Sequence, residues 1–377
     1  MSLTLPACQY IRSNSALLEA SDTWSQVPWV GIDTEFLRER TFYAVSGLIQ
    51  LATPDHYFLI DPIEVSDFSP LIELFECRQT VKVIHSGSED LELFNHTLNT
   101  LPTPLFDTQI AAAFLGQGLS VSYKNLVHSC CHVNLNKEEQ RSDWTQRPLS
   151  EQQLEYALQD VLYLGQLYCL QHEALQQKKI LDWVQQDCQS LLTSVLHEED
   201  PGLAYQRVKG AATLTGKELA RLQVLAQWRE KEAIKANLPK GFLIRDPQLL
   251  TLVQQNPTHF NGLKTIEGLH PRSLRRYGQL WLDLLAGTDP KLELALLPNE
   301  RLPKEAKPII KAIRHLLAER AADYDIAAEL FMNRKKLNLM VGNWLEQRTV
   351  DLTRFLPGWR YEVLSGPLNQ LFQELST

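Results

Sequence analysis

The chain has 377 residues, a net charge of −8, and a composition that is 44% hydrophobic and 22% charged. This length predicts two or three domains of ordinary globular composition. No basic segment followed by an apolar core opens the chain, and no apolar run is long enough to span a membrane. The six cysteines are scattered, which argues against a disulfide framework and predicts a reducing, cytoplasmic compartment. No membrane partner is expected, because of the lack of such an apolar run.

Strands are expected first. Three short apolar runs in succession predict an antiparallel meander over residues 30–36, 47–52 and 56–60. Helix and strand then alternate over residues 69–94, which is typical of a mixed sheet flanked by helices. A capping box at Ser150-Glu151-Gln152-Gln153 predicts the start of a helix that runs to about Gln176.

Helices dominate the second half of the chain. A polar linker at residues 197–202 is followed by predicted helices over 216–236, 247–255, 257–263 and 271–286. A second linker at 287–290 leads to further helices over 304–323, 327–334, 336–346 and 359–375. Each half ends in a glycine-containing turn and an amphipathic helix, which indicates a rough structural duplication.

The charge is uneven along the chain. Residues 1–200 hold 11 Lys and Arg against 27 Asp and Glu, whereas residues 201–288 hold 13 against 6. An acidic module that needs metal ions, joined to a basic module, suits a polyanionic substrate. A helical module that merely carries more solvated Lys and Arg explains the same distribution, so charge alone does not decide between them.

The strand over residues 30–36 carries two carboxylates one residue apart. Because side chains alternate along a strand, Asp33 and Glu35 point to the same face. Neighbouring buried carboxylates repel each other, and a divalent cation between them removes that cost. An exposed strand face with two solvated acids is the alternative, so further ligands are needed.

Further acids follow in the sequence. Asp90 lies at the start of a predicted helix after a buried strand, and Tyr156 and Asp160 lie four residues apart on one helix face. Together with Asp33 and Glu35 they provide four carboxylates and no His or Cys ligand. Oxygen ligands alone suit Mg²⁺ or Mn²⁺ and argue against zinc.

These motifs resemble a known family. The segments Ile32-Asp33-Thr34-Glu35-Phe36, His85-Ser86-Gly87-Ser88-Glu89-Asp90-Leu91 and Tyr156-Ala157-Leu158-Gln159-Asp160-Val161 are similar to the three exonuclease motifs of the ribonuclease D family. This family belongs to the tyrosine branch of the DEDD superfamily of 3'-5' exonucleases. Residues 213–287 resemble an HRDC domain, and residues 291–375 resemble a more divergent copy.

The resemblance implies a fold and domain limits. The expected fold is an α/β ribonuclease H-like exonuclease domain with a mixed sheet, followed by two all-α helical-bundle HRDC-like domains. The expected limits are 1–200 for the exonuclease domain, 210–288 for the first HRDC domain and 291–377 for the second.

The resemblance also implies a reaction. Two divalent ions, Mg²⁺ or Mn²⁺, would be held with Asp33 as the bridging ligand, Glu35 and Asp160 on the nucleophile side, and Asp90 on the second ion. Tyr156 would position the attacking water, since a phenol with an ordinary pKa of about 10 is a poor base at neutral pH. The expected activity is release of nucleoside 5'-monophosphates from RNA with a free 3' end, with tRNA precursors as substrates.

Two alternatives stay open at this point. A 3'-5' DNA exonuclease would use the same acids, because recognition of the 2'-hydroxyl depends on other contacts. A catalytically silent RNA-binding scaffold would not require all four acids and the tyrosine.

One helix of the basic module carries a candidate nucleic-acid site. Arg272, Arg275 and Arg276 could bind phosphate, and Tyr277 could stack on a base. A solvated helix face explains these residues equally well.

Overall fold

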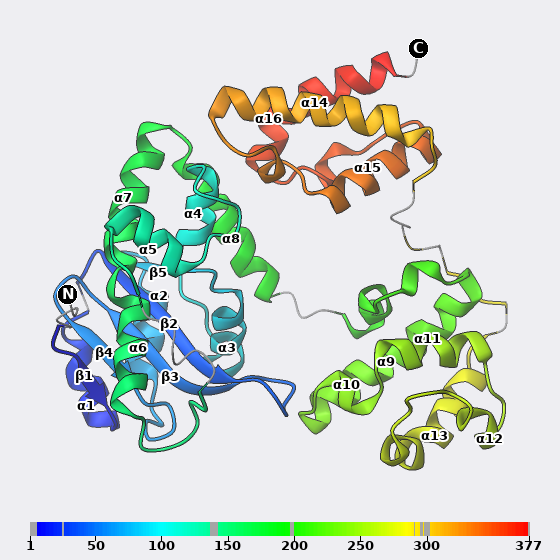
Figure 1. Ribbon diagram of the computed structural model, residues 1–377, viewed down its shortest axis with the longest axis horizontal. Helices are drawn as coiled ribbons and strands as arrows, with labels where there is room; N and C mark the ends of the chain where they lie inside the picture. The colour runs from blue at the N-terminus through cyan, green and yellow to red at the C-terminus, as the bar shows by residue number, and fades with distance from the viewer. Residues whose placement is uncertain are drawn as a thin grey trace. The chain divides into compact units, whose positions relative to one another are not determined.

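The computed structural model describes residues 6–24, 26–135, 142–196, 200–289, 291–294, 297 and 302–375 (Figure 1). Residues 197–199 and 290, at the two predicted linkers, lie outside this set. Contacts group the chain into two compact units: Met1–Leu37, Val45–His197 and Pro303–Thr377 form the first, and Arg38–Ala44 and Glu198–Leu302 form the second. None of the helices in the described ranges combines the length and apolarity needed to cross a membrane.

A six-stranded sheet forms the centre of the first unit. Its strands run in the order β1-β4-β3-β2-β5-β6, and β2 pairs antiparallel with β3 and parallel with β5. The strands are β1 (Gln9–Ile11), β2 (Trp29–Leu37), β3 (Val45–Ala52), β4 (Tyr57–Ile60), β5 (Val81–Ile84) and β6 (Leu105–Asp107). The predicted meander and the mixed sheet are therefore confirmed.

Helices pack around this sheet and follow it in the chain. Up to residue 196 they are α1 (Asn14–Ser21), α2 (Ser69–Glu76), α3 (Ser88–Leu98), α4 (Thr108–Phe114), α5 (Tyr123–Cys131), α6 (Glu151–Leu162), α7 (Leu164–Gln177) and α8 (Leu181–Leu196). The C-terminal ones are α14 (Ala306–Tyr324), the 3₁₀ turn Ala328–Leu330, α15 (Arg334–Gln347) and α16 (Trp359–Glu374).

The prediction of one continuous helix from residue 150 to about 176 is wrong. The helix breaks at Tyr163, whose backbone N–H donates to the Tyr123 hydroxyl (3.1 Å) instead of continuing the helical ladder. Two residues later, Gly165 lies so close to the Trp29 ring that a Cβ atom there would be 1.9 Å from it. The break separates α6, which carries Asp160, from α7.

A bulge in β3 shapes the strand pair that carries the first two acids. The register shifts between Glu35 and Phe36, because Gly47 is left unpaired between Ser46 and Leu48. A Cβ atom on Gly47 would lie 2.6 Å from the Trp144 Cβ atom, so only glycine permits this approach.

Arg147 fastens the Trp144 segment to the sheet. Its guanidinium donates to both carboxylate oxygens of Asp61 (2.6 and 2.7 Å) and to the Gly47 carbonyl (2.7 Å). Asp61 is fully buried, and although burial raises its pKa, the hydrogen bonds from Arg147 and Tyr10 lower it on balance. The carboxylate is thus held ionised by its partners.

Replacing Arg147→Met is expected to lower the free energy of unfolding by about 3–5 kcal/mol, because it leaves a buried carboxylate unpaired. Urea denaturation measures this loss. The matched control is Arg12→Met, whose pair with Glu64 is largely exposed and is expected to change the free energy of unfolding much less. If Arg147→Met lowers the free energy of unfolding no more than Arg12→Met does, the Asp61 pair does not stabilise the fold.

The second unit is helical, as predicted. Its helices are α9 (Gly216–Ala236), α10 (Lys240–Leu243), α11 (Asp246–Gln255), α12 (Phe260–Leu263) and α13 (Pro271–Ala286), with 3₁₀ turns at Pro201–Arg207 and Ala211–Thr213. A capping box at Thr215 and Glu218 begins α9, and Trp281 of α13 is fully buried in the core between the helices.

The C-terminal helices contact the sheet-bearing unit directly. Arg360 of α16 donates to both oxygens of Asp187 on α8 (2.6 and 2.8 Å), and the Trp359 ring stacks on Trp183 with centroids 4.3 Å apart. Contacts therefore group residues 303–377 with the sheet, whereas the sequence predicts them as a separate module.

Candidate active site

Three of the four predicted metal ligands meet in the first unit. β2 presents Asp33 and Glu35 on one face, and α6 presents Asp160 toward them. One carboxylate oxygen from each lies within 4.8 Å of the other two. Oxygen atoms from three side chains at this spacing can hold a hard divalent cation.

Asp90 lies beside this group rather than within it. It is on the first turn of α3, is 9% exposed, and accepts a hydrogen bond from the Thr34 hydroxyl. Its charge is close enough to raise the pKa of Asp33. Sequence reasoning missed Thr34, because strand alternation places it on the opposite face from Asp33 and nothing in the motif indicates its partner.

Asp107 fixes the turn from which Asp90 emerges. Its buried carboxylate accepts N–H groups of Ser86 (3.0 Å) and Gly87 (3.1 Å) before α3, and of Gln109 (2.8 Å) at the start of α4. Ser86 has a positive φ of 57°, which this contact helps to hold. Asp107 is therefore a positioning residue.

Without a bound cation, the ionised forms of these four carboxyl groups are unfavourable. Burial raises the pKa of Asp33 well above its ordinary value, and the charges of Asp90, Asp160 and Glu35 add to the shift. Burial and the charges of Asp160 and Asp90 raise the pKa of Glu35 to about 9. Burial raises the pKa of Asp160 to about 7 and that of Asp90 to about 6. A divalent ion would compensate this concentration of negative charge.

The metal-free protein is expected to lose thermal stability as the pH rises from about 5 to 9. The pKa values of Glu35, Asp160 and Asp90 are higher in the folded chain than in the unfolded one, so the folded state binds more protons in this window. Melting temperatures in EDTA should fall across it. Added Mg²⁺ should flatten the profile; a flat profile in EDTA would contradict the shifts.

Tyr156 lies one helical turn before Asp160 and donates a hydrogen bond to it. Burial and the charges of Asp160, Glu35 and Asp33 raise the pKa of Tyr156 far above its ordinary value. The phenol therefore stays protonated at neutral pH and acts as a donor. Its ring packs beside Trp144, with centroids 6.1 Å apart.

Gln50 lies on the same face and was missed by sequence reasoning. The β2–β3 register places it directly opposite Asp33, and residues opposite each other share a face. Gln50 is fully buried, and neither its amide nitrogen nor its amide oxygen has a hydrogen-bond partner among the described residues. Such an amide fits a site that takes up an ion with its water ligands. Gln50 can be assigned to this face from the β2–β3 register, and no sequence motif indicates it.

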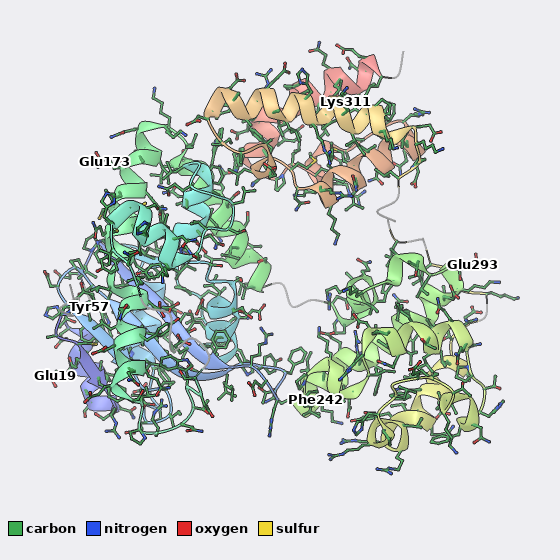
Figure 2. The ribbon with its side chains drawn as sticks, viewed as in Figure 1. Glu19, Tyr57, Glu173, Phe242, Glu293 and Lys311 are labelled. Atoms are coloured by element: carbon green, nitrogen blue, oxygen red, sulfur yellow. The ribbon has the colours of Figure 1, made fainter. Side chains whose placement is uncertain are left out.

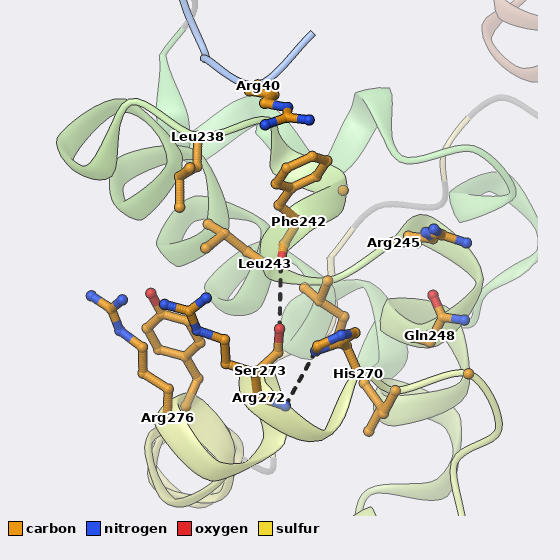
Figure 3. A pocket seen from close by; sticks show the side chains of 15 residues that line it. Arg40, Leu238, Phe242, Leu243, Arg245, Gln248, His270, Arg272, Ser273 and Arg276 are labelled. Carbon is orange, nitrogen blue, oxygen red and sulfur yellow. Dashed lines mark hydrogen bonds between the residues drawn. The ribbon is translucent and has the colours of Figure 1, made fainter.

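The predicted nucleic-acid residues of α13 differ in their surroundings. Arg272, Arg276 and the exposed Phe242 line a pocket in the second unit (Figure 2, Figure 3), and Arg275 is not among its lining residues. Tyr277 also lines it, but its ring is 7% exposed and packs against Trp228. Its hydroxyl donates to Glu232, so the ring face is not free to stack on a base.

Comparison with known proteins agrees with this geometry. A profile described as 3'-5' exonuclease matches residues 8–175, and an HRDC domain profile matches residues 218–285. Ribonuclease D of Pseudomonas paraeruginosa is 37% identical over 98% of both chains, and that of Escherichia coli is 32% identical over 97% of this chain and 98% of the relative.

A solved structure extends the match to three dimensions. The crystal structure of Escherichia coli RNase D superimposes with a TM-score of 0.89 at 31% identity, covering 98% of this chain and 99% of that one. That Escherichia coli protein is an exoribonuclease involved in structured RNA processing. The similarity spans the exonuclease fold and the helical C-terminal region together. This chain therefore belongs to the ribonuclease D family of 3'-5' exonucleases.

Proposed function

We propose that this chain is a metal-dependent 3'-5' exoribonuclease that releases nucleoside 5'-monophosphates from structured RNA, including tRNA precursors. The observation that carries the proposal is the convergence of Asp33, Glu35 and Asp160 in a chain of the ribonuclease D family. The structured RNA named for the Escherichia coli relative supports the substrate class.

Each acid has a proposed role. Asp33 would contact both of two divalent ions, Glu35 and Asp160 would hold the ion on the nucleophile side, and Asp90 would hold the other. Bound Mg²⁺ or Mn²⁺ would supply an activated water and stabilise the leaving 3'-oxygen. The hydrogen bond between Thr34 and Asp90 supports an oriented Asp90 carboxylate.

Tyr156 would orient the attacking water. Its raised pKa keeps the hydroxyl as a hydrogen-bond donor, and its bond to Asp160 places it beside the proposed ligands. Its ring packs beside the Trp144 ring.

The remaining assignments follow from the same family. Residues 1–200 are proposed as the exonuclease domain, 210–288 as the first HRDC domain and 291–377 as the second; the HRDC profile over 218–285 supports the middle one. The six free cysteines support a reducing compartment, the cytoplasm.

The ribonuclease D relatives favour RNA over the alternative DNA substrate. The partly buried acid cluster argues against a silent scaffold, because like charges held this close together and partly desolvated destabilise the fold unless a cation binds them.

A degradation assay tests the proposal. Purified protein is incubated with 5'-labelled RNA and with DNA of the same sequence, in Mg²⁺, in Mn²⁺ and in EDTA. We expect a one-nucleotide ladder on RNA that disappears in EDTA. Faster degradation of DNA, degradation that persists in EDTA, or no degradation of either polymer would refute it.

A further inference from the structure

Gln50 of β3 is a buried amide beside the candidate metal ligands. Its side chain is 0% exposed, and neither Nε2 nor Oε1 has a hydrogen-bond partner among the described residues. Burying an amide without a partner destabilises a fold, and nearly all buried polar groups in folded proteins are paired. The partner of Gln50 therefore comes from outside the chain.

The surroundings of Gln50 on the sheet indicate the side from which this partner comes. The strand register places Gln50 between Asp33 of β2 and Leu59 of β4. Its neighbours on the same face along β3 are Leu48 and Ala52, since side chains alternate along a strand. Leu48, Ala52 and Leu59 are buried and apolar. Of these four neighbours Asp33 alone carries a polar side chain, so a polar partner reaches the amide from the side of Asp33.

Other polar groups close to this face are occupied or do not reach the amide. Helix α6 packs across β2, β3 and β4 (Figure 1). Asp61, directly after β4, is held by both hydrogen bonds from Arg147. The Trp144 indole N–H lies in the same apolar cluster as Leu59 and also has no partner, so it does not donate to Gln50.

A hydrated divalent ion supplies the partner that the chain lacks. Asp33 is grouped with Glu35 and Asp160 at a spacing that can hold such an ion. Mg²⁺ and similar ions keep several of their water ligands when they bind to carboxylates. Water bound to a divalent cation is polarised and is a strong hydrogen-bond donor. The amide oxygen of Gln50 can accept from it.

We propose that Gln50 is a positioning residue of the metal centre, whose amide oxygen accepts a hydrogen bond from a water ligand of the ion held by Asp33, Glu35 and Asp160. The amide would fix the orientation of this water without binding the ion itself. The inference rests on the proposed function in taking a divalent ion as the occupant of the acid cluster. It accounts for a polar side chain at a core position of β3.

Two measurements on the full-length chain test this role: Mn²⁺ affinity by isothermal titration calorimetry, and the melting temperature in EDTA. Gln50→Met keeps an unbranched side chain of similar length and removes both polar atoms. We expect Mn²⁺ to bind roughly 10-fold more weakly or worse, the usual effect of losing a group that orients a metal ligand. We expect a melting temperature in EDTA no lower than that of the wild type, because the variant no longer buries an unpaired amide.

Gln171→Met is the matched control. Gln171 of α7 is 1% exposed, but its Nε2 donates a hydrogen bond to the Thr108 carbonyl (3.0 Å). Its replacement leaves a buried carbonyl without this donor, so the melting temperature in EDTA should fall. The Mn²⁺ affinity should stay that of the wild type, which is the reverse of the pattern expected for Gln50→Met.

An unchanged Mn²⁺ affinity of Gln50→Met would overturn the inference and leave the proposed metal site intact. A lower melting temperature of Gln50→Met in EDTA would also overturn it. The amide would then have a partner in the metal-free fold, such as a water shared with the Trp144 indole. A wild-type chain that binds no Mn²⁺ would overturn both this inference and the proposed function, so the two failures are distinguishable.

Discussion

Asp33→Asn is expected to lower kcat on RNA by at least about 10³-fold, because it removes the carboxylate proposed to contact both ions. The same substitution is expected to raise the melting temperature of the metal-free protein at pH 9. It removes a carboxylate whose ionised form is disfavoured by desolvation and by the charges of Asp90, Asp160 and Glu35. A gain of about 2–4 °C is expected for each kcal/mol of repulsion removed.

The two effects have opposite signs, which separates a metal ligand from a structural acid. Single-turnover degradation and thermal melting in EDTA measure them on the same preparations. The control is Glu155→Gln, an exposed acid of α6 next to Tyr156, for which neither quantity should change appreciably. Unaltered turnover in Asp33→Asn would remove Asp33 from the reaction, and lower stability would show that its charge is compensated within the fold.

Tyr156→Phe is expected to lower turnover by roughly 10²-fold while RNA affinity in EDTA stays close to that of the wild type. Only the hydroxyl is lost, so the contact of the ring with Trp144 is kept. Because the pKa of Tyr156 is raised far above its ordinary value, no decline of activity from deprotonation of this phenol is expected up to pH 10.

A pH–rate profile of both proteins separates orientation from proton transfer. If Tyr156 orients water, the variant is slower by the same factor at every pH between 6 and 10. Wild-type rates in the variant would remove the hydroxyl from the mechanism. A pH-dependent ratio of the two rates would instead assign it a proton-transfer role.

Local rules were sufficient to predict which of the candidate side chains that are close in sequence share a face. Strand alternation placed Asp33 and Glu35 on one face, and helical spacing placed Tyr156 one turn from Asp160. Both patterns depend on neighbours in sequence, and the structure retains both. The approach of Asp33 and Glu35 on β2 to Asp160 on α6 depends on tertiary contacts. The motif resemblance implied this approach, and the structure brings the three carboxylates together.

The residues that sequence reasoning missed depend on long-range contacts. Gln50 faces the site because β3 pairs with β2 in one particular register, and Thr34 supports Asp90 across 56 residues of chain. The break at Tyr163 depends on Tyr123, 40 residues earlier. No local propensity encodes such partners.

The basic helix shows the same limit. A run of arginines and a tyrosine suggested phosphate binding and base stacking, but burial places the Tyr277 ring in the core and Phe242 at the surface. Arg40 joins Arg272 at one pocket although 232 residues separate them in the chain.

Mn²⁺ binding observed by anomalous diffraction tests the central claim most directly. Crystals of the wild-type chain soaked in Mn²⁺ are expected to show an anomalous peak coordinated by Asp33, Glu35 and Asp160, and a second peak coordinated by Asp33 and Asp90. Asp33→Asn crystals should lose both. Wild-type crystals with Mn²⁺ bound elsewhere and no peak among these carboxylates would contradict the account.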